Sequence, residues 1–111
     1  MTTMTDDLAS VLQQLRAGLE AQYGDRLDRV LLYGSQARGD AGPESDVDVL
    51  VVLAGKVDPV AEIRATEFLV ADLSLEYDMV LSCVFLSVEE YEAEADLFLR
   101  NVRREAIPVA L

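Results

Sequence analysis

Apolar residues recur along this chain with two different spacings, and each spacing predicts a different kind of element. Between Thr5 and Gly24 they return every three or four residues, as on one face of an amphipathic helix. Thr5 stands before two acidic residues, a combination that typically begins a helix and suits the positive end of its dipole. We therefore expect a first helix that ends near Gly24, with this apolar stripe: Leu8, Val11, Leu12, Leu15 and Leu19.

Three short runs rich in valine, leucine and other large apolar residues predict β-strands instead. They span residues 28–33, 47–53 and 77–86. The second run is apolar from residue 49 onward and is expected to be buried. Residues 107–109, Ile-Pro-Val, predict a short segment at a sheet edge, because proline cannot donate a hydrogen bond to a neighbouring strand.

Further helices are predicted between and after these strands. Asp58-Pro59 begins one, since a proline in the first turn costs no hydrogen bond. Ser87 to Glu90 matches the capping box that begins a helix, and the last helix is expected to end near Glu105. Helices thus alternate with strands, which predicts an α/β (α+β) fold around a small sheet. The apolar side of the helix after Pro59 is expected to be Val60, Ile63, Phe68, Leu69 and Leu73.

Length and composition predict one domain, residues 1–111. Hydrophobic residues make up 51% of the chain, which favours a packed core over disorder. No apolar run approaches the ~20 residues that span a bilayer, and the acidic N-terminus is unlike a signal peptide. The single cysteine, Cys83, lies in an apolar run, where we expect a packing role. These features together predict a cytoplasmic protein without an internal disulfide.

The ionisable residues narrow the chemistry that this chain can perform. It has no histidine, which excludes Ser-His-Asp and Cys-His nucleophiles, a histidine general base and histidine zinc sites. The formal net charge of −12 repels a phosphate backbone, so no independent nucleic-acid binding is expected. The same charge suits a basic protein partner and attracts divalent cations. Any chemistry therefore falls to carboxylates and a hard metal ion.

Asp46 and Asp48 form a candidate metal-binding pair at the head of the second strand. Strand residues two apart point to the same face, with Cα atoms roughly 6.5 Å apart, so both carboxylates can converge on one or two ions. Carboxylate oxygens suit Mg²⁺, which takes its remaining ligands from water and substrate phosphates. A solvated loop just before the strand is the alternative interpretation of this common pattern.

Gly34-Ser35 follows the first strand, and ten residues separate it from Asp46. Glycine allows close approach of the backbone to a phosphate, and Ser35 is expected to cap the following turn while donating to a phosphate oxygen. An ordinary turn from strand to helix is the alternative. Together, a Gly-Ser turn and an Asp-x-Asp pair can hold a nucleoside triphosphate and its magnesium.

A third carboxylate is expected at the start of the third strand. Asp78 is the favoured candidate, because it lies further into the apolar run, where an uncompensated charge is costly. Glu76, two residues earlier on the same face, is the alternative. Either side chain could complete a second metal site or accept a proton from an attacking hydroxyl.

The segment LLYGSQARGDAGPESDVDVLVVL resembles the signature of the polymerase-β-type nucleotidyltransferase superfamily in its minimal form. The family pattern is Gly-Ser, ten residues, then Asp-x-Asp, and this chain matches it without a gap. The flanking Ala37-Arg38-Gly39 and Ser45 agree as well, and Asp78 falls where the family keeps its third carboxylate. The resemblance extends from the first helix to about Leu111, and implies a small mixed sheet flanked by helices.

Within the superfamily the chain resembles the small MNT-type members, often antitoxins paired with a HEPN ribonuclease toxin. The resemblance implies transfer of AMP from ATP to a tyrosine of such a partner, with Mg²⁺ as the cofactor. Asp46 and Asp48 would hold the metal on the triphosphate, joined by Asp78, which would also help to activate the acceptor hydroxyl. The implied phosphate-binding residues are Gly34, Ser35 and Arg38.

Two other functions remain open at this point. A binding-only antitoxin would mask its toxin and keep a vestigial site. A small-molecule nucleotidyltransferase, of the kind that modifies aminoglycosides, would use the acidic surface to attract a cationic acceptor. Arg38 has an alternative interpretation as an exposed ion-pair residue. The sequence does not give the acceptor, the number of AMP units, the preferred nucleotide or the oligomeric state.

Overall fold

The computed structural model describes residues 5–42, 46–94 and 96–110. Its first helix, α1, spans Asp6–Tyr23, as the apolar periodicity predicted. The hydroxyl of Thr5 accepts the N–H of Leu8 at 3.1 Å, which confirms Thr5 as the N-cap residue. A short 3₁₀ turn, η1 (Gly24–Arg26), then leads into the sheet.

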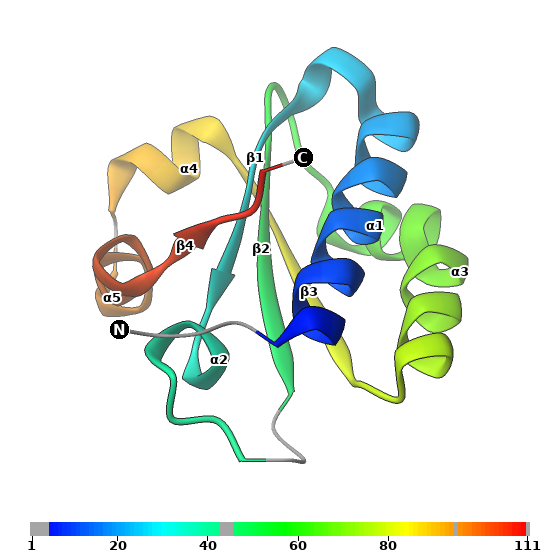
Figure 1. Ribbon diagram of the computed structural model, residues 1–111. Coiled ribbons are helices and arrows are strands. Elements are labelled where there is room, and N and C mark those ends of the chain that lie inside the picture. Colours follow the sequence, from blue (N-terminus) through cyan, green and yellow to red (C-terminus); the bar gives the residue numbers. More distant parts are fainter. Residues whose placement is uncertain (1–4, 43–45, 95, 111) are drawn as a thin grey trace.

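Four strands form one mixed sheet (Figure 1). They are β1 (Leu27–Tyr33), β2 (Val47–Leu53), β3 (Leu81–Ser87) and β4 (Ile107–Pro108), in the spatial order β3-β2-β1-β4. The strand pair β2–β3 is parallel, whereas β1 runs antiparallel to both β2 and β4. The predicted fold class, a small mixed sheet flanked by helices, is therefore confirmed. The Ile-Pro-Val segment does add a short edge strand.

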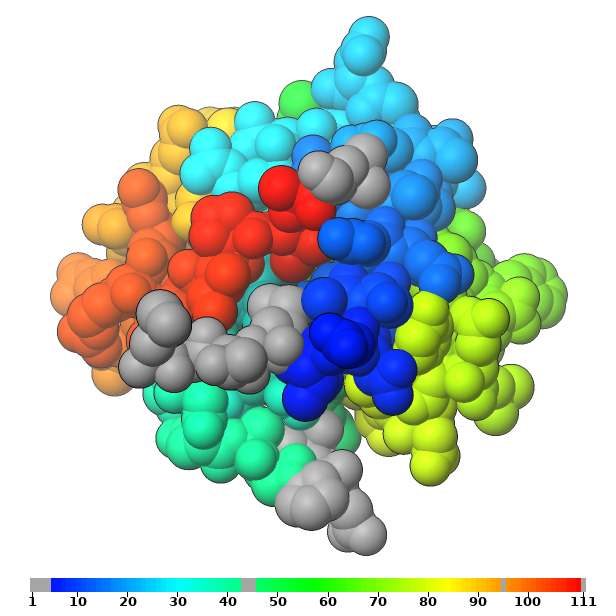
Figure 2. All heavy atoms as spheres, in the orientation of Figure 1, coloured from blue at the N-terminus to red at the C-terminus, as the bar shows by residue number. Residues whose placement is uncertain are grey.

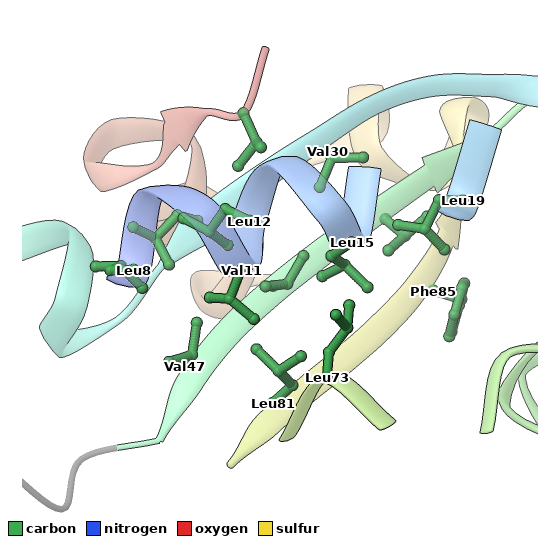
Figure 3. Packing of buried hydrophobic residues seen from close by; sticks show 14 of the residues in the cluster. Leu8, Val11, Leu12, Leu15, Leu19, Val30, Val47, Leu73, Leu81 and Phe85 are labelled. Carbon is green, nitrogen blue, oxygen red and sulfur yellow. The ribbon is translucent and has the colours of Figure 1, made fainter. Parts of the chain in front are cut away.

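One face of the sheet packs against α1 and against α3, which spans Pro59–Tyr77. The alternating residues of β2 that face this layer, Val47, Val49, Val51 and Leu53, are fully or almost fully buried. They meet the predicted leucine and valine stripe of α1, and Figure 3 shows Val11 and Leu15 pointing toward the sheet. Burial of this stripe stabilises the fold by roughly 1.5–3 kcal/mol for each large side chain.

The two helices of this layer approach closely where α1 carries a glycine. A Cβ at Gly18 would lie 2.6 Å from the terminal carbons of Leu69 on α3. Gly18 therefore makes room for the Leu69 side chain, which packs against the same core. This contact fixes which side of α3 faces inward.

The opposite face of the sheet packs against α4 (Val88–Ala93) and α5 (Leu97–Glu105). Leu50 and Val52 of β2 lie in this second cluster, with Tyr91, Leu99 and Val102 of the two helices. The capping box is confirmed, because Ser87 accepts the N–H of Glu90 while the Glu90 carboxylate accepts the N–H of Ser87. Glu94 separates the helices with a left-handed φ of 48°.

Two details of the predicted elements are wrong, and both concern α3. The third strand begins at Leu81 rather than Tyr77, because the four-residue spacing of Leu69, Leu73 and Tyr77 continues the helix through Tyr77. The apolar side of α3 is also different, since Leu69 and Leu73 pack inward but the remaining three predicted residues are exposed: Val60, Ile63 and Phe68. None of the helices in the described ranges is long and apolar enough to cross a membrane.

Candidate active site

The turn between β1 and the short helix α2 (Ser35–Arg38) is built around Gly34. Its φ of 74° and ψ of −155° lie in a region that is essentially restricted to glycine. The Gly34 carbonyl accepts the N–H groups of Ala37 and Arg38, both at 3.1 Å. Gly34, rather than the expected Ser35, therefore occupies the N-cap, and no side chain caps this helix. Ser35 is the first residue of α2 and stands beside the turn.

Asp48 lies on the face of the sheet that α4 and α5 cover. Side chains alternate along a strand, so Asp48 shares its face with Leu50 and Val52. Its partner across β1 is Tyr33, and its partner on β3 is Ser82. The carboxylate thus stands in the middle of the sheet, at the end where β1 leaves toward Gly34.

The Asp48 side chain is directed at Gly34. A Cβ built on Gly34 would lie 2.6 Å from Oδ2 of Asp48, which is shorter than any ordinary contact. Glycine suits the unusual backbone conformation at this position, and the absence of a Cβ lets the carboxylate approach in its observed position. The Gly-Ser turn and the second aspartate, thirteen and fourteen positions apart in the sequence, lie together in the fold.

Asp46 and Arg38 shift the pKa of Asp48 in opposite directions. Partial burial raises the pKa of Asp48 above its usual value, the nearby Asp46 carboxylate raises this pKa further, and the Arg38 guanidinium lowers it. Asp46 itself is exposed, one residue before β2 begins. Within the described ranges neither aspartate has an ion-pair partner within 4.0 Å. The two aspartates are therefore close enough to repel each other without a neutralising contact.

Arg38 ties the turn to the last helix. Its Nε donates to Asp40 at 3.2 Å and its Nη1 donates to Glu105 at 3.3 Å. These two hydrogen bonds raise the pKa of Arg38. Arg38 therefore forms ion pairs, as its alternative interpretation predicted. Its positive charge also lowers the pKa of Asp48.

Tyr33 is a neighbour of the site that the sequence analysis did not identify. It is half-buried, and its ring meets Phe98 of α5 edge-to-face, with centroids 5.6 Å apart. Burial raises the pKa of the Tyr33 hydroxyl, with a further contribution from the Asp48 carboxylate. Its position directly before Gly34 was the one available signal, because cross-strand pairing with Asp48 cannot be read from a single sequence.

The predicted third carboxylate is not on a strand. Asp78 is the C-cap of α3, with φ 52° and ψ 49°, and lies three residues before β3 begins. Both Asp78 and the alternative, Glu76, are exposed. Among residues 5–42, 46–94 and 96–110 no three acidic side chains gather closely enough to hold a metal ion. The structure therefore brings Asp46 and Asp48 together, and the third position remains a prediction. Ser45, part of the motif, lies outside the described residues.

Comparison with known proteins settles the family. The family model described as "Nucleotidyltransferase domain" matches residues 12–109, most of the chain. The chain belongs to this nucleotidyltransferase family. A putative protein adenylyltransferase of Methanocaldococcus jannaschii is 34% identical over 76 residues, which cover 68% of this chain and 76% of that protein.

Solved structures agree with this nucleotidyltransferase fold. A toxin–antitoxin complex crystallised with AMP-PNP matches with a TM-score of 0.61 at 18% identity, covering 88% of this chain and 72% of that one. A complex of tri-AMPylated Shewanella oneidensis HEPN toxin with MNT antitoxin matches with a TM-score of 0.54 at 18% identity, covering 92% of this chain and 71% of that one. At such identities these matches support the fold.

The carboxylates of this nucleotidyltransferase fit a divalent cation. Asp46 and Asp48 offer hard oxygen ligands, and the partial burial that raises the pKa of Asp48 would be offset by a bound positive charge. Two protein carboxylates are a usual complement for Mg²⁺, whose other ligands are water and phosphate oxygens. The donor set therefore suits a metal that arrives with a nucleotide.

Proposed function

We propose that this nucleotidyltransferase transfers AMP from ATP to a tyrosine hydroxyl of a HEPN-type toxin, and so acts as its antitoxin. Two comparisons support the proposal: the Methanocaldococcus jannaschii relative is named for protein adenylylation, and the Shewanella oneidensis HEPN toxin is AMPylated in its complex with an MNT antitoxin. The proposal takes residues 1–111 as one catalytic domain that works in the cytoplasm, where ATP is abundant.

The observation that carries this proposal is the approach of Asp48 to Gly34. It brings the Asp48 carboxylate beside a turn whose glycine carries no side chain, which supports a phosphate-binding role for this turn. Asp46 and Asp48 would hold Mg²⁺, and the metal would neutralise charge on the triphosphate. Gly34 and Ser35 would contact the β- and γ-phosphates, and Arg38 would add positive charge beside them.

The proposed reaction is an in-line displacement at the α-phosphorus of ATP. The tyrosine oxygen forms a bond to this phosphorus, and the bond to the bridging oxygen of the β-phosphate breaks, so that pyrophosphate leaves. The hydroxyl proton passes to a carboxylate, for which Asp78 and Glu76 remain the candidates. Both lie at the end of α3 that leads into β3.

The charge of the protein supports a protein acceptor over a nucleic acid. A net charge of −12 would repel RNA or DNA and would attract a basic protein. A ribonuclease that binds RNA is expected to be basic. The acidic surface would thus steer the enzyme toward its partner and away from the partner's own substrate.

Intact-mass spectrometry of a HEPN partner produced separately from this protein tests the proposal. The partner would be purified, incubated with this protein, ATP and Mg²⁺, and weighed before and after. One or more added AMP units with the wild type, and none with Asp48→Asn, is the expected result. An unmodified partner that stays bound to both forms would support masking without transfer. An unmodified, unbound partner would point to a small-molecule acceptor instead.

A further inference from the structure

The outer side of α3 carries large apolar side chains that the fold leaves exposed. Leu75 is 82% exposed, Phe68 78%, Val60 61% and Ile63 52%. A single exposed apolar residue is ordinary, but exposed apolar residues grouped on one element are typical of interaction sites. These four residues, which we call the α3 stripe, make up four of the seven exposed large apolar residues in the part of the chain that the structure describes.

The α3 stripe follows from the helical geometry. With 100° per residue, Val60, Phe68 and Leu75 project within about 80° of one another, and Ile63 borders them. The stripe extends over about 22 Å between residues 60 and 75. The opposite side of α3 is occupied by α1, through Leu69 against Gly18. In Figure 2, α3 forms the right-hand edge of the molecule in yellow-green, beyond α1.

The charged residues near the α3 stripe indicate which kind of partner surface would be complementary to it. Glu67, Asp72 and Glu76 are exposed acids on the same helix. Arg64, the one exposed base within Pro59–Tyr77, projects between Val60 and Phe68 and so lies inside the stripe. The chain as a whole carries a net charge of −12. A complementary surface would have an apolar centre bordered by lysine or arginine. A second copy of this chain would bring the same acids against these acids, which disfavours a homodimer through this face.

The α3 stripe also ends beside the candidate active site. Leu75 lies in the last turn of α3, three residues before Asp78. The chain then reaches Val80, which is 60% exposed and whose carbonyl accepts the N–H of Val47 at 2.8 Å. Val47 lies between Asp46 and Asp48. A protein bound along the stripe would therefore extend toward the end of the sheet where β2 begins; Asp46 is exposed at this end, and Asp48 points to the opposite face of the sheet, which α4 and α5 cover.

We propose that the α3 stripe is the docking surface for the protein acceptor, whose contact face is apolar and bordered by basic residues. The inference rests on the proposed function and adds where the acceptor binds. Docking along α3 would present an acceptor hydroxyl to the nucleotide at Asp46 and Asp48. Transfer of AMP to a protein acceptor would then require the α3 stripe, whereas transfer to a small tyrosine compound would not.

The test uses the double variant Phe68→Ser/Leu75→Ser in the full chain. Both side chains are more than three-quarters exposed, so their removal is expected to leave the free energy of unfolding almost unchanged. Leu97→Ser is the matched control, because Leu97 is a 70% exposed apolar residue on α5 rather than α3. Urea unfolding of all three proteins would verify equal stability.

Two acceptors separate docking from chemistry: the purified HEPN partner and a short tyrosine peptide. The double variant is expected to lower kcat/KM for the HEPN partner at least about tenfold, with the peptide rate and the Leu97→Ser enzyme unchanged. Equal losses with both acceptors, or no loss with either, would overturn the docking proposal. If the wild type modifies neither acceptor, the proposed function fails, and calorimetric titration of the partner still tests docking: weaker binding by the double variant alone supports it, and unchanged binding overturns it.

Sedimentation of the isolated chain tests the competing occupant. The wild type is expected to remain a monomer at micromolar concentration, since acidic faces would oppose each other in a dimer. A wild-type dimer that the double variant converts to a monomer would assign the α3 stripe to a second copy and would overturn the proposal.

Discussion

A side chain at residue 34 would collide with the carboxylate of Asp48: a Cβ on Gly34 would lie 2.6 Å from Asp48 Oδ2. The contact joins the end of β1 to the start of β2, and it fixes where the carboxylate can stand relative to the turn. The backbone of Gly34 is also in a conformation that other residues rarely adopt. The backbone conformation therefore favours glycine at this position, and any Cβ there would require the Asp48 carboxylate to move.

Gly34→Ala is predicted to remove nucleotidyl transfer while the protein still folds. The added methyl group would displace Asp48, and a shift of about 1 Å at a catalytic group can cost about 10²-fold in rate. The unfavourable backbone conformation would also lower the free energy of unfolding by about 1–3 kcal/mol. Transfer rates, measured at a temperature where circular dichroism shows a folded protein, give the first quantity, and urea titration gives the second.

Gly24→Ala is the matched control for this prediction. Gly24 has φ 55° and ψ −128°, and a Cβ there would meet no atom within 4 Å. It should lose a similar amount of stability but keep its transfer activity. Equal activity in the two variants would show that the approach of Asp48 to Gly34 has no role in catalysis.

Asp48→Asn is predicted to stabilise the metal-free protein at neutral pH. Burial raises the pKa of Asp48, so the stability that its protonated form contributes is present below the unfolded pKa and is lost as pH rises through the folded value. At pH 7 asparagine avoids this loss, and near pH 3 the two proteins should converge. Thermal unfolding midpoints at both pH values, with exposed Asp25→Asn as the charge control, check this sign. A less stable Asp48→Asn at pH 7 would contradict it.

Mg²⁺ is expected to raise the unfolding midpoint of the wild type at pH 7 and to have little effect on Asp48→Asn. The physical reason is that binding to the folded state alone adds stability by mass action. Calcium-free buffer with graded MgCl₂ gives the measurement. Equal midpoint shifts in the two proteins would exclude Asp48 as a ligand.

Arg38→Ala is predicted to move the acidic limb of the rate profile to higher pH. The Arg38 guanidinium lowers the pKa of Asp48, so its removal lets that pKa rise and a higher pH is needed for the ionised form. Glu105→Gln removes the carboxylate that pairs with Arg38 at 3.3 Å but leaves the positive charge of Arg38 in place. It should therefore shift the acidic limb of the rate profile less than Arg38→Ala does. Rates measured between pH 4 and pH 8 at saturating ATP distinguish the two; identical profiles for Arg38→Ala and the wild type would contradict the prediction.

Tyr23 and Glu62 supply a prediction about the fold alone. The Tyr23 hydroxyl donates to Glu62 Oε1 at 3.2 Å, and burial, followed by the Glu62 charge, raises the pKa of Tyr23 to about 12. The unfolded chain loses this proton near pH 10, so the free energy of unfolding should fall as pH rises from 10 to about 12. Tyr23→Phe should be less stable by about 1–3 kcal/mol at pH 7, since a buried carboxylate loses a donor.

The alkaline part is checked by urea titrations at pH 8 and pH 11. The wild type should lose more stability over this interval than Tyr23→Phe, because the variant lacks the titrating group. Parallel losses in the two proteins would show that the Tyr23 pKa is not raised in solution.

Elements with a single clear signal could be predicted from the sequence. The cap at Thr5 and the leucine stripe gave α1, and the Asp46 to Leu53 pattern gave β2 with its observed boundaries. The capping box gave the start of α4. In each case the local preference and the final packing agree, which is why one sequence suffices.

The segment from Tyr77 to Val80 could not be predicted because two periodicities overlap there. Its apolar residues continue both the helix before it and the strand after it; in the structure Tyr77 packs against the core as part of α3, and the left-handed Asp78 ends the helix. The exposed side of α3 was missed for a related reason. Apolar residues lie on two sides of this helix, and a single sequence does not say which side meets the core.

The candidate site was predictable in its parts but not in its geometry. The Gly-Ser turn and the Asp-x-Asp pair were visible as a motif, whereas the contact of Asp48 with Gly34 and the pairing of Asp48 with Tyr33 depend on strand register. Register is fixed by long-range packing that periodicity does not encode. The placement of Asp78 before β3 is the main consequence for function, since it leaves the third carboxylate open.

The most direct test of AMP transfer uses radiolabelled ATP and measures which phosphorus becomes attached to the acceptor protein. The HEPN partner would be incubated with this protein and Mg²⁺ in two parallel reactions, one with ATP labelled at the α-phosphorus and one with ATP labelled at the γ-phosphorus. Nucleotidyl transfer predicts that the α-label becomes attached to the partner and the γ-label leaves as pyrophosphate, with no attachment by Asp48→Asn. Attachment of the γ-label, or of neither label, would contradict the account.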